Sequence, residues 1–207
     1  MFIGRADCAG IKKAMKKRER IEAVYEAALR VFARHGFRKT TVEDIAVELG
    51  MTKGNLYLYA RDKRELYQKS VEHALLRWQG RVREAVERES DARAMFTTMC
   101  RKAVEYLSVD DDFRSVLVHD PDIFPMFPVR DPFERINRNS MAMIRFILKK
   151  GMADGAFRRV NTRTITNAIF SIYKMFIIRM YIRPEGKHMR KLFEETLDLL
   201  TRGLFLD

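Results

Sequence analysis

Residues 41–59 read TVEDIAVELGMTKGNLYLY, and they carry the signals of two short helices joined by a tight turn. Thr41 can cap the first helix, and Asp44 stands three residues later in the position of a capping box. Gly50 suits the left-handed backbone that ends a helix, and Thr52 can cap the second helix. The stretch therefore predicts a helix, a sharp turn and another helix.

Three residues within this stretch form a set that brings two helices close together. Ala46 is small enough for a close approach, Gly50 allows the sharp turn, and Leu56 can pack between the helices. This is the helix-turn-helix arrangement, in which the second helix enters the major groove of DNA. An ordinary helical hairpin in the core of a bundle is the alternative interpretation of the same pattern.

The flanking sequence favours the DNA-binding interpretation. From Ile21 to Ala74 the chain reads IEAVYEAALRVFARHGFRKTTVEDIAVELGMTKGNLYLYARDKRELYQKSVEHA. This segment resembles the N-terminal DNA-binding domain of the TetR family of bacterial transcriptional repressors, through AALRVFARHGF, TTVEDIAVELGMTKGNLYLY and DKRELY. It covers about a quarter of the chain and departs from the family pattern at Ala60, where the family usually has an aromatic residue. The resemblance implies an all-α protein, with an N-terminal three-helix helix-turn-helix domain and a C-terminal helical bundle for ligand binding and dimerisation.

Side chains at the helix N-termini and along the second helix are the candidates for DNA contact. Helix N-termini present backbone N–H groups, and hydroxyl and basic groups nearby can reach the phosphates. We expect Lys53 and Gly54 to lie closest to the base edges, with Asn55 on the same helix. The residues that we expect to contact phosphates are Thr41, Thr52, Tyr57, Tyr59 and Lys63.

Composition and charge agree with a nucleic-acid partner. The chain has 207 residues and a net charge of +12, which favours nucleic acid or an anionic membrane surface as the partner. The most apolar later stretch, Ile165 to Ile182, is interrupted by Lys174 and Arg179, so we expect no membrane span. The two cysteines lie far apart and the N-terminus lacks the apolar core of a signal peptide, which predicts a cytoplasmic protein.

The domain organisation follows from the helix pattern. Residues 1–18 are predicted to be a loose basic arm, which is either solvated or in contact with DNA phosphates or the minor groove. The helix-turn-helix domain is expected at 19–66, and a helix from Asp62 to about Ser90 links it to the second domain at 67–207. An acidic triplet, residues 110–112, can cap a helix N-terminus or bind a cation, and we favour the cap.

The second domain is rich in Met and Phe. The chain has 12 Met and 14 Phe, and flexible Met side chains with aromatic rings can line an adaptable apolar cavity or simply fill a core. Members of the family use this domain to bind small effectors, so the resemblance implies a small, apolar effector that releases DNA. The residues predicted to line the effector pocket are Met95, Phe96, Met99, Phe124, Phe127, Met143, Phe146 and Met175.

Two apolar helices are predicted at the end of the chain, at about 162–182 and about 184–204. Both are apolar over a wide arc, so one flank can face the chain's own core and another a partner. In the family this pair docks on its two-fold mate as a four-helix bundle, and a two-fold homodimer also matches a palindromic double-stranded operator. The predicted interface centres on Ile172, Phe176, Leu197 and Leu200.

No catalytic pattern stands out in the sequence. It has no nucleophile motif, no Gly-rich phosphate loop and no zinc-ligand spacing, and its four histidines are scattered. We therefore expect no catalytic residues, no metal and no cofactor, and predict a ligand-responsive DNA-binding transcriptional regulator, a repressor rather than an enzyme. The alternative is a basic helical interaction protein that does not bind DNA sequence-specifically.

Overall fold

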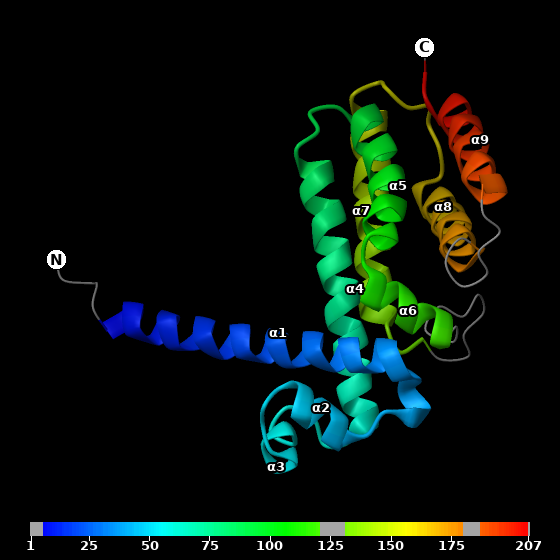
Figure 1. Ribbon diagram of the computed structural model, residues 1–207. Coiled ribbons are helices and arrows are strands. Elements are labelled where there is room, and N and C mark those ends of the chain that lie inside the picture. The colour runs from blue at the N-terminus through cyan, green and yellow to red at the C-terminus, as the bar shows by residue number, and fades with distance from the viewer. Residues whose placement is uncertain (1–5, 121–130, 180–186, 207) are drawn as a thin grey trace. The chain divides into compact units, whose positions relative to one another are not determined.

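The computed structural model describes residues 6–120, 131–179 and 187–206, and for 6–14 and 187–188 only the backbone. Within these ranges the regular structure is helical, apart from one isolated β-bridge between Phe157 and Phe205. The predicted all-α class is therefore confirmed. None of these helices is long and apolar enough to cross a membrane. The helices (Figure 1) are α1 Ala6–Lys39, α2 Val42–Glu48, α3 Lys53–Leu56, α4 Lys63–Glu87, α5 Ala92–Ser108, α6 Asp111–His119, α7 Glu134–Ala153, α8 Thr162–Ile177 and α9 Lys187–Leu204.

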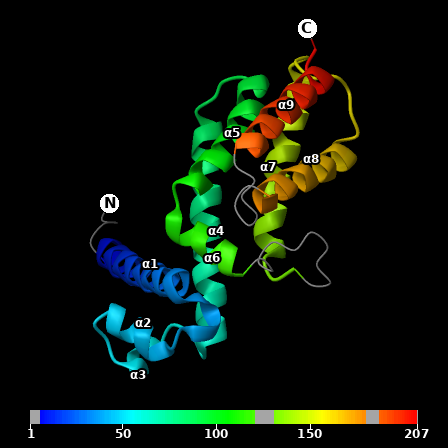
Figure 2. The ribbon, with the colours of Figure 1, turned by 45° about the vertical axis from the view of Figure 1, so that its right-hand side comes forward.

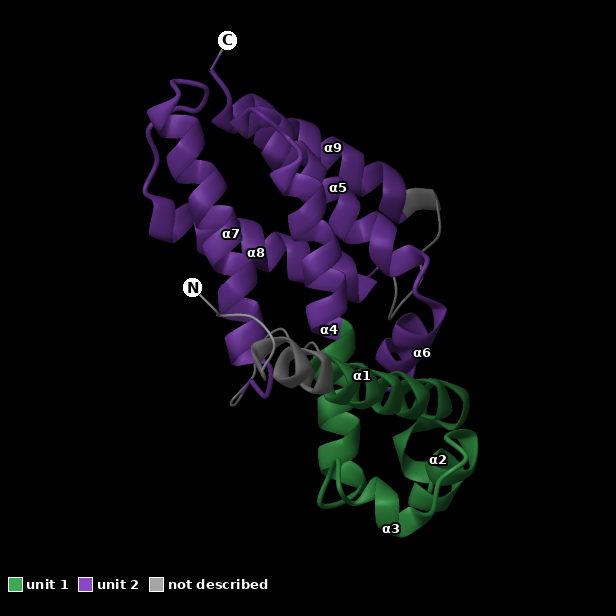
Figure 3. Cartoon of the chain, turned by 90° about the vertical axis from the view of Figure 1, so that its left-hand side faces the viewer, with its two compact units in different colours: residues 1–74 green, residues 75–207 purple. Residues whose placement is uncertain are grey.

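The chain divides into two compact units, 1–74 and 75–207, coloured separately in Figure 3. The division falls inside α4, eight residues later than the boundary expected after residue 66. The reason is that the first turns of α4 pack into unit 1. Tyr67 lies edge-on to Phe32 with ring centroids 5.0 Å apart, and it also contacts Phe37 at 5.0 Å.

The loose arm predicted for residues 1–18 is wrong where the structure describes it, because residues 6–18 belong to α1. The segment is rich in Ala and Lys, which favour a helix. Arg18 also donates to Glu22 at 2.7 Å, one helical turn away, which supports the helix locally. The backbone leaves helical geometry at Gly36, whose φ is 73°, a conformation that glycine adopts without a steric clash.

Unit 2 is held together by α7, which packs against both α5 and α8 (Figure 2). The loop after α7 is tied to the end of α9. Phe157 stacks on Phe205 at 5.0 Å, and Arg158 N donates to Leu204 O at 2.9 Å. The acidic triplet acts as a helix cap, as predicted, since Phe113 N donates to Asp110 Oδ1 at 3.1 Å. The described residues contain no group of three or more acidic, His or Cys side chains that could hold a metal ion.

Candidate functional site

The helix-turn-helix is built from hydrogen bonds between residues close in sequence. Asp44 N donates to Thr41 Oγ1 at 3.1 Å and Thr41 N to Asp44 Oδ2 at 2.8 Å, which is the predicted capping box. These bonds to Thr41 lower the pKa of the Asp44 carboxyl. The turn passes through Gly50 at φ 61°, and Asn55 N donates to Thr52 Oγ1 at 3.3 Å to cap α3.

The inner face of the motif is buried as the sequence indicates. Ile45, Ala46 and Leu56 are between 0 and 3% exposed. The outer face is open to solvent, and it includes the predicted contact residues Thr41, Thr52, Lys53, Gly54, Asn55 and Tyr57. Val47 and Leu58 are also on this outer face, both 80% exposed, and were not among the predicted contact residues. The sequence pattern could have indicated their exposure, because neither residue belongs to the apolar stripe that is buried.

Two predicted contact residues are partly buried and engaged in unit 1. The ammonium of Lys63 donates to Phe37 O and Thr40 O, both at 2.9 Å, and lies 4.6 Å from the centroid of the Phe37 ring. It therefore satisfies carbonyl groups at the end of α1. The carbonyl of Tyr59 accepts from Lys69 Nζ at 2.9 Å. Phosphate contacts by Tyr59 and Lys63 stay predictions.

Ion pairs connect two acidic residues of α2, Glu43 and Glu48, to basic partners. Lys53 pairs with Glu43, and this hydrogen bond raises the pKa of Lys53 and lowers that of Glu43. Glu48 accepts from Arg34 Nη1 at 3.0 Å, which holds α2 against α1. The carboxylates of Glu43 and Glu48 are therefore both paired within unit 1.

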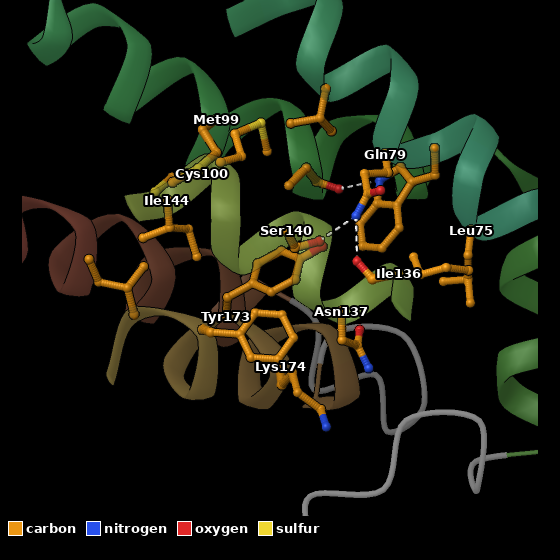
Figure 4. A pocket seen from close by; sticks show the side chains of 16 residues that line it. Leu75, Gln79, Met99, Cys100, Ile136, Asn137, Ser140, Ile144, Tyr173 and Lys174 are labelled. Carbon is orange, nitrogen blue, oxygen red and sulfur yellow. Dashed lines mark hydrogen bonds between the residues drawn. The ribbon is translucent and has the colours of Figure 1, made fainter. Parts of the chain in front are cut away.

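Unit 2 contains a cavity of about 60 Å³ whose walls come from α4, α5, α7 and α8 (Figure 4). Of the predicted effector residues, Met99 and Met143 line it. Phe96 instead packs edge-on against Phe205 at 5.9 Å, and Phe146 is 58% exposed. Met95 and Met175 are not among its lining residues, and Phe124 and Phe127 lie outside the described residues.

Polar and aromatic groups of the cavity wall were missed by the sequence analysis. Trp78 stacks on Tyr173 with centroids 5.9 Å apart and donates through Nε1 to Ala103 O at 2.9 Å. Gln79 Nε2 donates to Ser140 Oγ at 2.7 Å and to the carbonyl of Ile136 at 2.9 Å. The sequence pattern shows Gln79 and Ser140 only as polar residues on amphipathic helices.

Burial shifts the pKa of two titratable side chains in the cavity wall. Lys174 is only 8% exposed; desolvation lowers its pKa, while the nearby Asp131 carboxylate acts in the opposite direction. Burial raises the pKa of the Cys100 thiol to about 12, so it stays protonated at neutral pH. One signal of the Lys174 site was visible, because this lysine interrupts an apolar helix.

The predicted dimer residues separate into two pairs. Phe176 and Leu197 are 1% and 5% exposed, and Phe176 packs edge-on against Phe193 at 5.3 Å, so both side chains are used within their own chain. Ile172 and Leu200 are partly buried and line a groove between α8 and α9, together with the 72% exposed Leu199. A partner could therefore contact the second pair.

Comparisons with known proteins agree with this geometry. The family described as "Bacterial regulatory proteins, tetR family" matches residues 24–69. The uncharacterized HTH-type transcriptional regulator YfiR of Bacillus subtilis is 37% identical over 59 residues, which are 28% of this chain and 29% of that protein. The fatty acid metabolism regulator protein of Bacillus subtilis is 20% identical over 91% of this chain and 97% of its own length.

A solved structure has the same fold. The transcriptional regulator FadR from Bacillus subtilis, in complex with stearoyl-CoA, superposes with a TM-score of 0.71 and is 19% identical, covering 87% of this chain and 97% of that one. These relatives are named as regulators and the family match covers the helix-turn-helix, which removes the alternative of a basic helical interaction protein. Residues 24–69 therefore match the DNA-binding domain of the TetR family of bacterial regulatory proteins, and the helix-turn-helix within them serves to bind DNA.

Proposed function

We propose that the chain is a homodimeric repressor that binds a palindromic operator and releases it when a small ligand with an apolar body enters the cavity of unit 2. The observation that carries this proposal is the course of α4. This helix begins beside the helix-turn-helix, where Lys63 and Tyr67 pack in unit 1, and then supplies Trp78 and Gln79 to the cavity wall. A ligand that moves the wall moves the helix that supports the DNA-reading unit.

The coupling follows from differential binding. A ligand shifts an equilibrium only by its different affinity for the two forms, and allosteric couplings are typically about 1–3 kcal/mol. The operator affinity should therefore fall roughly 5–150-fold at saturating ligand, and operator should weaken ligand binding by the same factor. The stearoyl-CoA complex of the FadR relative supports this proposal, because a protein of the same fold accepts a ligand with a long apolar chain.

The test is an operator titration at fixed salt, with and without a ligand found by thermal shift. Salt must be held constant because the phosphate contribution to DNA affinity depends on it. A ligand that saturates the cavity and leaves operator affinity unchanged would show that the cavity is packing space, and the switch would fail. Catalysis has no part in this proposal, which places the protein in the cytoplasm with the DNA it regulates.

Lys53 is the proposed reader of the operator. It is exposed at the start of α3, and a lysine that contacts guanine contributes about 1–3 kcal/mol of discrimination. Lys53→Ala should weaken operator binding more than random-sequence binding. Lys149→Ala, which removes an exposed lysine of α7 in unit 2, is the matched control and should change neither. Equal losses on both DNAs would assign Lys53 to the phosphates alone.

The proposed dimer uses the groove between α8 and α9. Leu199→Glu should give a monomer in sedimentation, because a two-fold interface would bury the new charge without a partner. Val118→Glu is the matched control, since Val118 is also exposed, at 49%, but lies on α6. A wild-type chain that sediments as a monomer at micromolar concentration would contradict the dimer.

A further inference from the structure

We propose that Leu58 selects thymine in the operator, by contacting the C5 methyl group that a thymine presents in the major groove of DNA. This inference deepens the proposed function and rests on it, since it names one base that the helix-turn-helix reads. Leu58 was not among the predicted DNA contacts. Its side chain has no hydrogen-bonding group, whereas the predicted contacts Thr52, Lys53 and Asn55 all have one.

Leu58 is one of the two most exposed large apolar side chains among the described residues. It is 80% exposed, as is Val47 on α2, whereas Leu56, two positions earlier, is 1% exposed. Single exposed leucines are common on protein surfaces, so exposure alone assigns no role to Leu58. Its position in the helix-turn-helix does.

The second helix of the motif, which packs beside α2 in unit 1 (Figure 3), continues as a tight turn through Leu58. Leu58 N donates to Asn55 O at 3.3 Å, and Tyr59 N donates to Leu56 O at 3.0 Å. Two residues span slightly more than half a helical turn, so Leu58 lies on the side opposite the buried Leu56. The exposed residues Gly54 and Asn55 occupy that side one turn earlier, so it faces away from the core of unit 1.

Gly54 leaves the surface next to Leu58 open. A Cβ added at Gly54 would meet only Thr52 Oγ1 within 4 Å, at 3.9 Å, so no neighbouring segment covers the backbone there. Side chains of a helix tilt toward its N-terminus, so the Leu58 side chain leans over the turn that contains Gly54. A base edge can therefore approach the backbone at Gly54 and meet the methyl groups of the leucine at the same place.

The methyl group of thymine is the part of a base edge that suits an apolar side chain. In the major groove the base edges present hydrogen-bond donors and acceptors, and the C5 methyl group of thymine is their apolar group. A leucine placed against a donor or an acceptor would displace its water without replacing the hydrogen bond, which costs free energy. Against the methyl group, both surfaces leave water and are stabilised by the hydrophobic effect.

A protein partner is the competing occupant of an exposed leucine. The neighbours of Leu58 on the second helix, Thr52, Lys53 and Asn55, are polar and exposed, so this helix does not offer the apolar core that a protein interface has. The net charge of +12 also favours an acidic partner over a second copy of the chain. Leu58 instead continues the face that the helix-turn-helix presents to DNA, which commits it to a base.

The test measures binding of the full-length protein, at fixed salt, to a duplex that it has selected from random-sequence DNA. Each thymine of this duplex is replaced in turn by deoxyuridine, which forms the same base pair and lacks the C5 methyl group. We expect one position in each half-site at which uracil weakens binding by about fourfold, the effect of leaving one methyl group unburied. Replacement in both half-sites should weaken it by about fifteenfold, because distant sites are additive.

Three variants assign the effect to Leu58. Leu58→Ala should bind the thymine and uracil duplexes equally at that position and respond as wild type does elsewhere, because only the contact with the methyl group is lost. Leu58→Met should keep the preference for thymine, since its side chain is also apolar and adapts to its surroundings. Val109→Ala, which truncates a 66% exposed apolar side chain of unit 2, should respond to uracil as wild type does. Circular dichroism checks that each variant is folded.

Two results would overturn the contact between Leu58 and thymine. One is a selected duplex at which no uracil weakens wild-type binding, and the other is a Leu58→Ala variant that responds to every uracil as wild type does. If that second variant also sediments as a smaller species, Leu58 belongs to a contact between copies of the chain.

The same experiment keeps this inference apart from the proposed function. A protein that enriches no sequence from the random pool would contradict operator binding, and the thymine contact with it. A selected duplex that a cavity ligand releases, but whose thymines do not depend on Leu58, would contradict the thymine contact alone. Loss of the thymine preference in Leu58→Ala, with no release by a ligand that saturates the cavity, would support the contact and contradict only the switch.

Discussion

The helix-turn-helix and the cavity differ in how far apart in the sequence their parts lie. In the helix-turn-helix, the bonds that shape the motif join residues three positions apart, as between Thr41 and Asp44 or Thr52 and Asn55. In the cavity, Gln79 on α4 bonds to Ser140 on α7, and Trp78 stacks on Tyr173 of α8. The helix-turn-helix is therefore formed by contacts between residues close in sequence, whereas the cavity forms only when helices distant in sequence pack together.

This difference predicts how the two sites respond to change. A substitution in the local motif should remove one cap or one contact and leave the rest of the chain intact. A substitution in the packed unit should disturb several helices together, because cores are close-packed and transmit strain. The single tryptophan lies in unit 2, so its fluorescence follows that unit, while circular dichroism follows the helices of both.

The largest effect is expected at Phe176. Its side chain is 1% exposed against Phe193, and Phe176→Ala should lower the free energy of unfolding of unit 2 by about 3–5 kcal/mol through cavity formation. Urea unfolding followed by Trp78 fluorescence measures it. Phe146→Ala is the matched control, because Phe146 is 58% exposed and its loss should cost no more than about 0.5 kcal/mol. Equal losses would contradict the assignment of Phe176 to the core.

The next effect concerns Gly151 in α7. A Cβ added there would overlap the ring of Phe157, which stacks on Phe205, so Gly151→Ala should destabilise unit 2 by about 1–3 kcal/mol through overpacking. Gly80→Ala is the contrasting variant on α4, where a Cβ meets nothing, and it should stabilise by about 0.5–1 kcal/mol. If Gly151→Ala stabilises unit 2 instead, the loop after α7 can move to make room for the added methyl group.

A smaller and more local effect is expected at Thr41. Removing the cap by Thr41→Ala should cost about 1 kcal/mol, because the N–H of Asp44 loses its acceptor. Amide hydrogen exchange should accelerate in α2 and remain unchanged in α5 and α7. Thr164→Ala, at an exposed threonine of α8 that caps no helix, is the control. Faster amide exchange throughout unit 2 would contradict the claim that the Thr41 cap acts only on its own helix.

The smallest effect is a pH dependence at the start of α4. Glu65 accepts from the backbone N–H of Arg61 at 2.6 Å and from the Arg61 side chain, with Lys69 close by; these contacts lower its pKa from 4.5 to about 2. A lowered folded-state pKa stabilises the protein above the unfolded value, and this stabilisation is lost as pH falls from 4.5 to about 2.

Glu65→Gln should therefore be less stable than wild type at neutral pH, and the difference should shrink as the pH falls below 4.5. Urea unfolding over this pH range measures the difference. Gln68→Ala, at an exposed neighbour on α4, removes no titrating group and serves as the control. If the difference in unfolding free energy between Glu65→Gln and wild type stays constant with pH, Glu65 stabilises the protein through packing rather than through its charge.

The sequence by itself determined the helix-turn-helix, because its signals are short-range. Thr41, Gly50 and Thr52 act on their own backbone or on residues three positions away, so their effect can be read without a partner element. The same holds for the Asp110 cap and for the break at Gly36. For residues 6–18 the basic charge predicts a loose arm, whereas the helix propensity of their Ala and Lys residues favours the helix that the structure has.

Only the tertiary structure decided which side chains meet in unit 2. Apolar periodicity marks Phe96, Met99 and Phe176 alike as facing inward, but packing sends Met99 to the cavity, Phe96 to the Phe205 ring and Phe176 to the Phe193 ring. Lys174 and Lys63 likewise gained their surroundings from helices far away in the sequence. The physical reason is that the hydrophobic effect has no direction, so a pattern of apolar residues says that a side chain is buried without saying against what.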